Sequence, residues 1–544
     1  MTRPFRLSAL ARPAAAVGAG IALWTTFPPL NWWPAAPAGV AVLALAVRAR
    51  RLRAAAGLGL LAGFGIWVPT VSFLQPLGVD AWIAVSVIES LWFVGLGMAL
   101  CLVGRLRWWP LAVGLMWVGE EFLRDRWPFG GFPWARLAFG QVDGPLVRLA
   151  ALGGAPLVTF AVALAGGLLA YLVLELGPGG RRRLVPLAAA TAAVGIVVAA
   201  PLAIGLPTAG TAQNGAPSSV VVAAIQGNVP RLGLEEFAQR HAVTQDHLDE
   251  TRVLAQQVAA GQLPAPQIVI WPENASDLDP RTDPVARSQV DAAVAAVGVP
   301  TLIGAVIDGP GPNHVQNAGI VWSPATGPGE IYLKRHLVPF GEYLPFRGLL
   351  TRLVGEFSLI PKDFVPGRRR GTLQLGPARI ADAICFEIAD DAVVRQAVTG
   401  GGRLLVVQTN NASYEHPGDS GNGGETAQQL AITRLRAIES GRAAVVAATS
   451  GVSAMVAPDG KVIARTGVFT PAVLDMRLPL RDPLTIADRV GPWPEWILSL
   501  AALAALVLAL LQYRGQRRAN SLDLDSRVID RPAAANASAA STQP

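Results

Sequence analysis

Three residues in the second half of the chain have the types and positions that nucleophilic chemistry needs. Cys385 directly follows the apolar run Ile380–Ile384, and Glu273 follows the apolar run Ile268–Trp271. Lys334 lies in a loop that is dense in Lys, His, Glu and aromatic residues. A thiol with an ordinary pKa of about 8.5 needs a base or a cation nearby to react as a thiolate. Glu273 could take the thiol proton, and Lys334 could offer a fixed positive charge to a developing oxyanion.

Each of these residues also has a structural interpretation. A free cysteine is commonly a buried small hydrophobe, a glutamate at a strand end can be solvated, and a lone lysine usually lies at the surface. An unpaired thiol in an extracytoplasmic domain would be an oxidation liability, which favours a reactive Cys385. His336, two residues beyond Lys334, is a competing candidate for the base, although it could equally orient the loop.

The composition is that of a membrane protein. Of the 544 residues, 52% are hydrophobic and 15% are charged, whereas a soluble domain carries about 25% charged residues. The net charge of +7 comes from arginines that form short clusters beside apolar runs, not one basic face. We therefore expect no nucleic-acid partner.

Cysteine and histidine usage excludes two further classes. The chain has two cysteines, which belong to no CxxC pair and supply no disulfide framework. Its five histidines show neither an HExxH motif nor paired-ligand spacing. We expect no metal and no cofactor.

Apolar runs divide the first part of the chain into about seven candidate membrane helices within residues 1–206, and one more is expected within 489–513. A spanning helix needs roughly 20 apolar residues, and the first, second and fifth runs fall short of this. The runs are Ala14–Phe27, Pro34–Val47, Ala54–Leu74, Ala81–Val103, Trp108–Phe122, Val147–Leu176, Leu184–Leu206 and Trp496–Leu511.

Arginine clusters predict the orientation of these helices. Lys and Arg are retained in cytoplasmic loops, and the clusters Arg48–Arg53, Arg105–Arg107, Arg181–Arg183 and Arg514–Arg518 follow every second apolar run. All four then lie in the cytoplasm, as do both termini. The same parity predicts that the domain between the seventh and eighth helices is extracytoplasmic.

Beyond a Gly-, Thr-, Ala- and Pro-rich linker at 207–217, the period changes to that of alternating strands and helices, which predicts an α/β domain over 218–488. Residues 514–544 are expected to be a disordered tail, because they contain few apolar side chains. The expected strands are Ser219–Gln226, Ile268–Trp271, Thr301–Val306, Ile380–Ile384, Leu404–Gln408 and Ala443–Ala448, and the expected helices are Glu235–Ala259, Val285–Ala296 and Glu425–Ser440.

Taken together, three motifs resemble a known superfamily. Trp271-Pro272-Glu273, the loop Lys334–Glu342 and Cys385-Phe386-Glu387, in this chain order, resemble the carbon–nitrogen hydrolase (nitrilase) superfamily and its Glu-Lys-Cys triad. With several candidate spans before the domain and one after it, the resemblance narrows to the apolipoprotein N-acyltransferase family. The loop Gly131–Trp134 also looks like this family.

The resemblance implies an αββα sandwich in which Cys385 is the nucleophile, Glu273 the general base and Lys334 an oxyanion stabiliser. Glu342 and Glu387 match acidic positions that support the site, and Phe386 stands where relatives often carry Tyr. The implied enzyme lies in the bacterial cytoplasmic membrane. It takes an acyl group from a phospholipid onto the cysteine as a thioester, then transfers it to the N-terminal α-amine of a diacylglyceryl-cysteine on an apolipoprotein.

Both substrates of such an enzyme are anchored in the lipid bilayer, so aromatic and polar loop residues near the site are candidates for lining it. They could equally be aromatic residues of the membrane interface, which is an ordinary place for Trp and Phe. The candidates are Trp127, Phe132, Trp134, Asn410 and Tyr414.

Two other functions remain open from the sequence. A membrane-tethered amidase or nitrilase could hydrolyse a small C–N bond with the same three residues, although a small soluble substrate would not require seven preceding helices. A transporter with an external domain would place ionisable residues deep in its spans, and only Glu89 and, near a helix end, Glu175 stand out.

Overall fold

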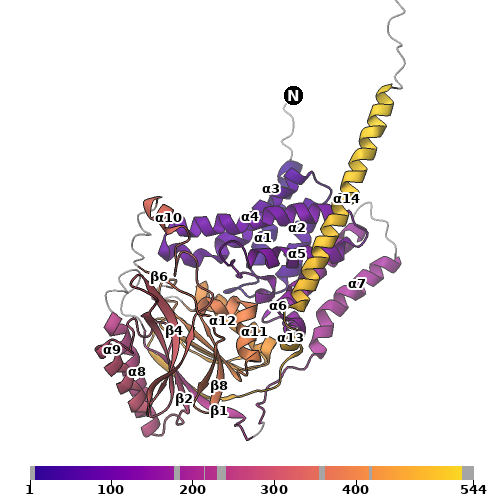
Figure 1. Cartoon of the computed structure of the whole chain (residues 1–544). Coiled ribbons are helices and arrows are strands. Elements are labelled where there is room, and N and C mark those ends of the chain that lie inside the picture. Colours follow the sequence, from indigo (N-terminus) through magenta and orange to yellow (C-terminus); the bar gives the residue numbers. More distant parts are fainter. Residues whose placement is uncertain are drawn as a thin grey trace, which may run out of the picture.

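The protein, seen in a computed structural model, combines a bundle of helices with an α/β domain (Figure 1). The structure describes residues 7–176, 184–212, 215–228, 240–353, 362–415 and 420–529. The bundle consists of α1 (Leu7–Trp24), α2 (Ala35–Val47), α3 (Leu52–Thr70), α4 (Val79–Val103), α5 (Trp109–Arg124), α6 (Ala150–Leu176), α7 (Leu184–Ala199) and the late helix α14 (Trp493–Ile529).

Five segments in the described ranges are helical, long and apolar enough to cross a membrane: Leu52–Thr70, Val79–Val103, Pro145–Leu176, Val185–Ala203 and Trp493–Arg517. The first two helices are apolar but shorter, as their sequence predicts. Outward-facing Leu, Ile and Val side chains on α7 and α14 remain exposed. Such surfaces suit contact with lipid rather than water.

Small residues allow the bundle helices to approach closely. A Cβ added to Gly20 of α1 would meet the carbonyl oxygen of Ala62 and the Cα of Gly65 on α3. Close backbone contact through small residues is the usual way that membrane helices associate.

The loops with basic residues gather at the end of the bundle that lies away from the α/β domain (Figure 1). Arg48 donates to the carbonyl oxygen of Gly104, and the guanidinium of Arg105 lies over the ring of Tyr513. The cluster Arg181–Arg183 lies outside the described residues.

One expectation about the spans was wrong. Besides Glu89 of α4, the helix α5 buries Glu120 and Glu121 near its C-terminal end. They fall within a run that is otherwise apolar, and their charges are compensated by Arg124 and Arg136, which lie beyond that run. Buried charges of this kind are tolerated when they are paired.

The α/β domain contains two sheets. The first has the order β13-β1-β2-β3-β4-β5, with β6 beside β4, and the second has the order β12-β11-β10-β9-β8-β7. The first comprises β1 (Ser219–Gln226), β2 (Ile268–Ile270), β3 (Thr301–Asp308), β4 (His314–Ser323), β5 (Gly327–Leu333), β6 (Asp363–Phe364) and β13 (Ala472–Pro479); the second comprises β7 (Thr372–Leu375), β8 (Ala378–Ile384), β9 (Leu404–Thr409), β10 (Ala444–Ala448), β11 (Ala454–Val456) and β12 (Val462–Arg465).

The central strands are parallel and buried on both faces, which explains their continuous apolar runs. In β1, Val220 and Val222 point between the sheets, and Ala223 and Ile225 point to the outer helix layer. The two sheets are therefore the inner layers of a four-layer sandwich.

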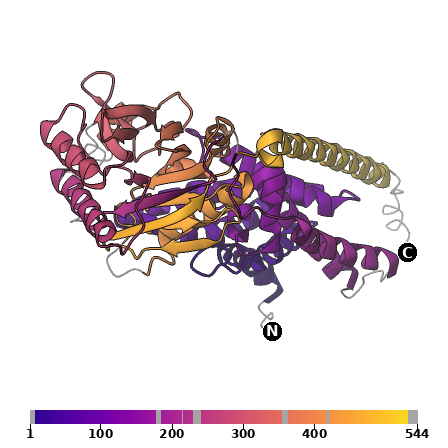
Figure 2. The same cartoon turned by 90° about the horizontal axis from the view of Figure 1, so that it is seen from below.

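The outer layers face opposite ways. The helices α8 (Arg240–Ala259) and α9 (Pro284–Val297) cover the first sheet on the side away from the bundle (Figures 1 and 2). The helices α11 (Asp391–Thr399) and α12 (Gly424–Ser440) cover the second sheet and share one apolar core with the bundle. The short helices α10 (Arg347–Leu353) and α13 (Ile486–Val490) complete the domain. The fold is thus the expected αββα sandwich, with one helix layer fused to the membrane helices.

Some predicted boundaries differ from those of the structure. The strands β4 and β5 had not been predicted, and part of the expected helix Glu235–Ala259 lies outside the described residues. The last helix continues to Ile529, so the expectation of a disordered tail from residue 514 was wrong for residues 514–529. Good helix formers such as Gln516 and Arg517 continue an existing helix without a new nucleation cost. Residues 530–544 lie outside the described part.

Candidate active site

Cys385 begins the 3-10 turn η7 (Cys385–Ala389), directly after the parallel strand β8. Its side chain is 8% exposed, whereas Cys101 in α4 is fully buried. Its φ of +55° lies in the left-handed region, which costs a non-glycine residue roughly 1–2 kcal/mol. Strain of this kind persists where surrounding contacts enforce it. The sharp turn presents the sulfur at the carboxyl end of the strand, the usual edge for ligand sites in open α/β sheets.

Glu273 follows β2, at the carboxyl end of a parallel strand in the other sheet. Its side chain is buried, which rules out the solvated interpretation. One carboxylate oxygen accepts from Asn317 Nδ2 at 2.6 Å and from Lys334 Nζ at 3.0 Å. The other accepts from the backbone N–H of Asn410 at 2.9 Å. The carboxylate is therefore held in a single orientation.

Lys334 follows β5 and is buried, so it is not a surface lysine. Its Nζ lies 3.0 Å from Glu273 Oε1 and 2.9 Å from Glu342 Oε1. Burial alone would lower the pKa of Lys334, but the two carboxylates outweigh burial and raise this pKa well above its usual range. Lys334 therefore carries a permanent positive charge.

Burial is the main cause that raises the pKa of the Cys385 thiol, and the negative charge of Glu273 raises it further. The ammonium of Lys334 acts in the opposite direction and lowers it. The thiol is thus neutral at rest and within electrostatic reach of both groups. Such a thiol must lose its proton to a base as it attacks, which Glu273 can accept.

Glu387 joins the nucleophile turn to the Lys334 loop. Its carboxylate accepts from the backbone N–H groups of Ile384 at 2.9 Å, Arg335 at 2.6 Å and His336 at 3.1 Å, and from the Tyr332 hydroxyl at 2.9 Å. Because these donors come from both segments, one buried carboxylate fixes the turn and the loop together.

His336 contacts two residues of the segment that follows Cys385, Phe386 and Asp390. Its Nδ1 lies 2.7 Å from Asp390 Oδ2, and its ring meets the Phe386 ring edge-to-face, with centroids 5.3 Å apart. These contacts fit the interpretation in which His336 orients the loop.

Phe386 lies against the loop from the membrane half. Its ring stacks on Phe132, with centroids 5.8 Å apart, and on Trp134, with centroids 6.0 Å apart. Trp134 Nε1 donates to Gln428 of α12 at 2.7 Å. Two of the predicted lining residues therefore reach the neighbour of the nucleophile.

Tyr414 packs edge-to-face on Phe73, with centroids 5.8 Å apart. Burial raises the pKa of Tyr414, and the negative charge that Cys385 carries as a thiolate adds to this, so the phenol lies within electrostatic reach of the nucleophile. Asn410 contributes its backbone N–H to Glu273, while its side-chain oxygen accepts from Thr449. The side chain of Trp127 is 67% exposed and packs on Trp92, as expected of an interfacial residue rather than a lining residue.

Three site residues had not been predicted. Asn317 of β4 donates to Glu273 at 2.6 Å and to Glu342 at 3.3 Å, and Gln429 of α12 donates to Cys385 Sγ at 3.7 Å. Glu425, at the start of α12, is buried and bonded to Asn411, and burial and then the charge of Glu415 raise its pKa to about 8. Asn is depleted in strands, so Asn317 weakens the pattern from which its strand could have been predicted.

Metal ligands are not grouped in this region. Among the residues that the structure describes, no three His, Cys, Asp or Glu side chains are placed together to hold a metal ion. The cluster around Cys385 is instead arranged around the ammonium of Lys334.

Comparison with known families divides the chain as its structure does. Residues 19–168 match the family model described as the apolipoprotein N-acyltransferase N-terminal domain. Residues 221–482 match the carbon–nitrogen hydrolase model.

Two curated relatives match nearly the whole chain. The apolipoprotein N-acyltransferase of Mycolicibacterium smegmatis is 40% identical over 514 residues, covering 92% of this chain and 85% of the relative. The apolipoprotein N-acyltransferase of Azotobacter vinelandii is 30% identical over 528 residues, covering 93% and 96%. Among solved structures, an amidase from Nesterenkonia sp. is similar at 20% identity with a TM-score of 0.35, covering 48% of this chain and 92% of that one.

Proposed function

The chain belongs to the apolipoprotein N-acyltransferase family and is an acyltransferase, and we propose that it moves a fatty acyl group from a phospholipid to the N-terminal α-amine of a diacylglyceryl apolipoprotein through a thioester on Cys385. One arrangement carries the proposal: Lys334 Nζ lies 3.0 Å from Glu273, and the charges of both act on the Cys385 thiol. A nucleophile, a base and a fixed cation are what acyl transfer needs.

In the first half-reaction, Glu273 takes the thiol proton while the sulfur attacks the ester carbonyl carbon. The C–S bond forms, and the negative charge on the carbonyl oxygen is stabilised by Lys334 and by backbone N–H groups beside Cys385. The C–O bond to glycerol then breaks, and the glycerol oxygen takes the proton from Glu273. A lysophospholipid leaves and the acyl group remains on Cys385.

In the second half-reaction, the α-amine of the lipoprotein attacks the thioester carbon and gives up a proton to Glu273. The C–S bond breaks, and the proton returns to the sulfur. The same residues therefore serve both steps, since each passes through a tetrahedral oxyanion.

Water would compete with the amine for the thioester. The aromatic cluster of Phe132, Trp134 and Phe386 includes the residue that follows Cys385 in the chain, and it belongs to the core that the domain shares with the bundle. We assign it the role of admitting acyl chains while limiting water.

Incubation of the purified protein with phospholipid carrying a labelled acyl chain tests the nucleophile. Wild type is expected to retain a hydroxylamine-sensitive adduct, and Cys385→Ala is expected to lose it. Cys101→Ala is the matched control, because this second thiol is buried in α4 and should not affect labelling. Equal labelling of the Cys385→Ala variant would show that another residue is the nucleophile.

The acceptor is tested by adding a diacylated lipopeptide to the labelled enzyme. A free N-terminal amine should discharge the adduct into a triacylated peptide, and an acetylated N-terminus should not. Release of the label only as free fatty acid would favour the hydrolytic alternative.

The orientation in the membrane follows from the arginine clusters. We propose that the loops with Arg48 and Arg105, and both termini, face the cytoplasm, with the α/β domain on the outer side of the cytoplasmic membrane. Single cysteines introduced at exposed positions, Lys461 in the domain and Arg50 in the bundle loop, test this in intact cells from which the cell wall has been removed. Only the first should react with an impermeant maleimide.

A further inference from the structure

The loop from Asp125 to Arg136 brings Phe132 and Trp134 from the membrane half to the ring of Phe386. The loop forms no regular helix or strand, and its few backbone hydrogen bonds are local, such as that from the N–H of Gly131 to the carbonyl oxygen of Pro128 at 2.8 Å. Two fully buried arginines stand at its ends, Arg124 and Arg136. Their contacts determine how the loop is held.

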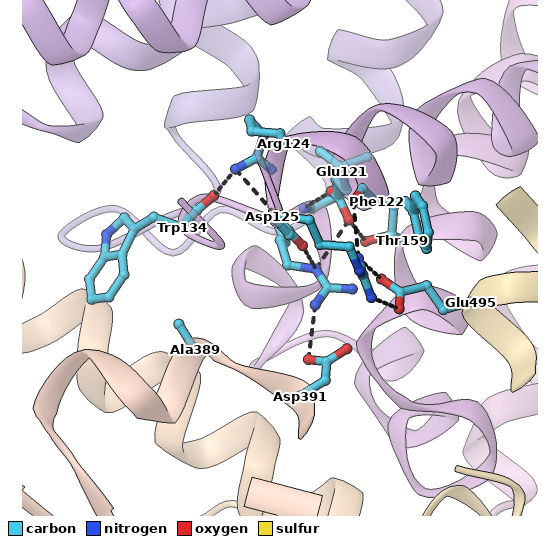
Figure 3. Close-up of polar contacts among 12 residues, drawn as sticks. Glu121, Phe122, Arg124, Asp125, Trp134, Thr159, Ala389, Asp391 and Glu495 are labelled. Atoms are coloured by element: carbon cyan, nitrogen blue, oxygen red, sulfur yellow. Dashed lines mark hydrogen bonds and ion pairs between the residues drawn. The ribbon is translucent and has the colours of Figure 1, made fainter. Parts of the chain in front are cut away.

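Arg124, the last residue of α5, binds the backbone that carries the two rings. Its Nη1 donates to the carbonyl oxygen of Phe132 at 2.7 Å. It also donates to the carbonyl oxygen of Trp134 at 2.8 Å (Figure 3). Its Nε forms an ion pair with Glu120 at 3.0 Å. The backbone N–H of Phe132 donates in turn to the carbonyl oxygen of Arg124 at 3.0 Å. The guanidinium therefore fixes the two residues that face Phe386.

Arg136 connects the other end of the loop to α11, the helix that follows the Cys385 turn. Its Nη1 lies 2.9 Å from Oδ1 of Asp391, the first residue of α11. Its Nε lies 3.3 Å from both Glu121 and Asp125. A planar guanidinium presents five N–H donors in fixed directions, so it can hold three carboxylates in a defined arrangement.

The groups around this pair come from several elements. Glu121 of α5 also accepts from the backbone N–H of Leu137 and from the Thr159 hydroxyl of α6, both at 2.8 Å. Asp391 also accepts from Arg436 of α12 at 2.5 Å. The network thus runs without a gap from the bundle to the helices behind Cys385.

We propose that Arg124 and Arg136 are positioning residues for acyl transfer: they hold Phe132 and Trp134 against Phe386 so that the three rings form the wall along which the acyl chain on Cys385 lies. This inference rests on the proposed function. It assigns chain-length recognition to ion pairs that never touch the substrate.

If Arg124 and Arg136 only stabilise the fold, their variants should lose different reaction rates from those lost if the two residues position the rings. General destabilisation would slow every reaction of Cys385, whereas a displaced wall would affect only substrates that use it. We therefore compare three rates: acyl-enzyme formation from long-chain phospholipid, the same reaction with short-chain phospholipid, and alkylation of Cys385 by iodoacetamide.

The main variant is Glu120→Gln/Arg124→Met, which removes both charges of the Glu120–Arg124 pair; Asp125, which lies 3.5 Å from Arg124, keeps its ion pair with Arg136. Its preference for long over short chains should fall by about tenfold, because small displacements of a binding wall act strongly on the rate. Its alkylation by iodoacetamide should stay within about twofold of wild type. Phe132→Ala should lose the same preference, and combining the changes should add little, since both act through one wall.

Arg136→Lys is the second variant. It keeps the positive charge but loses the planar guanidinium with its several donors. It should show the same selective loss of the preference for long over short acyl chains. Arg403→Lys is the matched control: this arginine is also buried and paired, with Asp482, but it contacts the linker rather than the loop. It should keep the chain-length preference.

Unchanged preference in both test variants would overturn the inference, as would an equal loss in Arg403→Lys. A parallel fall of all three rates would also overturn it, since it would show a structural role. If wild type forms no acyl-enzyme at all, the proposed function fails instead, and the two failures are thereby distinguished.

Discussion

Lys334 Nζ lies 3.0 Å from Glu273 Oε1, with both side chains buried at the carboxyl ends of strands in one sheet. Glu342 binds the same ammonium at 2.9 Å. Two carboxylates around one lysine keep it charged, so its Nζ is a fixed electrostatic group rather than a base. Glu273 is left as the group that can receive the thiol proton.

Lys334→Met should lower the rate of acyl-enzyme formation by about two to three orders of magnitude, as expected when one preorganised oxyanion donor is lost. The side chain keeps its length, so packing changes little. Single-turnover labelling with radioactive phospholipid measures this rate.

Lys461→Met is the control, because Lys461 is exposed in a turn after β11. It should leave the rate unchanged. A Lys334→Met variant that labels at the wild-type rate would remove Lys334 from the mechanism.

Asn317→Ala should lower the same rate by about tenfold, the equivalent of one net hydrogen bond to a charged group. Its amide donates to both Glu273 and Glu342, so its loss removes one donor from each of the two carboxylates. Asn317→Asp should be worse, since it adds a third negative charge beside them. Asn313→Ala, at an exposed position just before the same strand, is the control.

The sequence could predict the positions of Cys385 and Glu273 because a strand end is a local feature. It could not predict Asn317, since the pairing of this residue with Glu273 depends on sheet order and joins strands far apart in the chain. The strand β4 itself begins with His, Val, Gln and Asn, a composition that weakens the β pattern.

The loop after α5 also depends on contacts between residues far apart in the chain, which the sequence alone could not predict. The resemblance of Gly131–Trp134 to the family pointed to this loop, but the role of its charges depends on Asp391, more than two hundred residues later. Long-range ion pairs of this kind leave no periodic trace in a sequence.

Glu387→Gln should destabilise the folded protein by roughly 1–3 kcal/mol, because the new amide NH₂ would face backbone N–H groups that have lost their acceptor. Acyl-enzyme formation should fall as well, since the same carboxylate holds the turn and the loop. Thermal unfolding followed by fluorescence and single-turnover labelling measure the two effects.

Tyr332→Phe is the milder comparison, because it removes one donor to Glu387 and leaves the backbone donors in place. It should cost less stability than Glu387→Gln. The reverse order would contradict a central role for this carboxylate.

His247 of α8 is a buried titratable group that has no assigned part in this chemistry. Its ring packs on Trp271, with centroids 5.5 Å apart, and its Nδ1 lies 2.7 Å from the carbonyl oxygen of Val243. Burial lowers the pKa of His247 from 6.5 to about 4, because the charged ring would lose its hydration.

The pKa of His247 is depressed by folding, so its contribution to stability is fully present above pH 6.5 and is lost as the pH falls from 6.5 to about 4. At this site the unfolded chain binds one proton more than the folded protein within this window, so His247 alone should lower the free energy of unfolding by about 1.4 kcal/mol per pH unit as the pH falls. His247→Phe should make the unfolding temperature less dependent on pH over the same window. His241→Gln, at an exposed position on the same helix, should keep the wild-type slope. Equal slopes in wild type and His247→Phe would show that this ring takes up its proton in the folded protein as readily as in the unfolded chain.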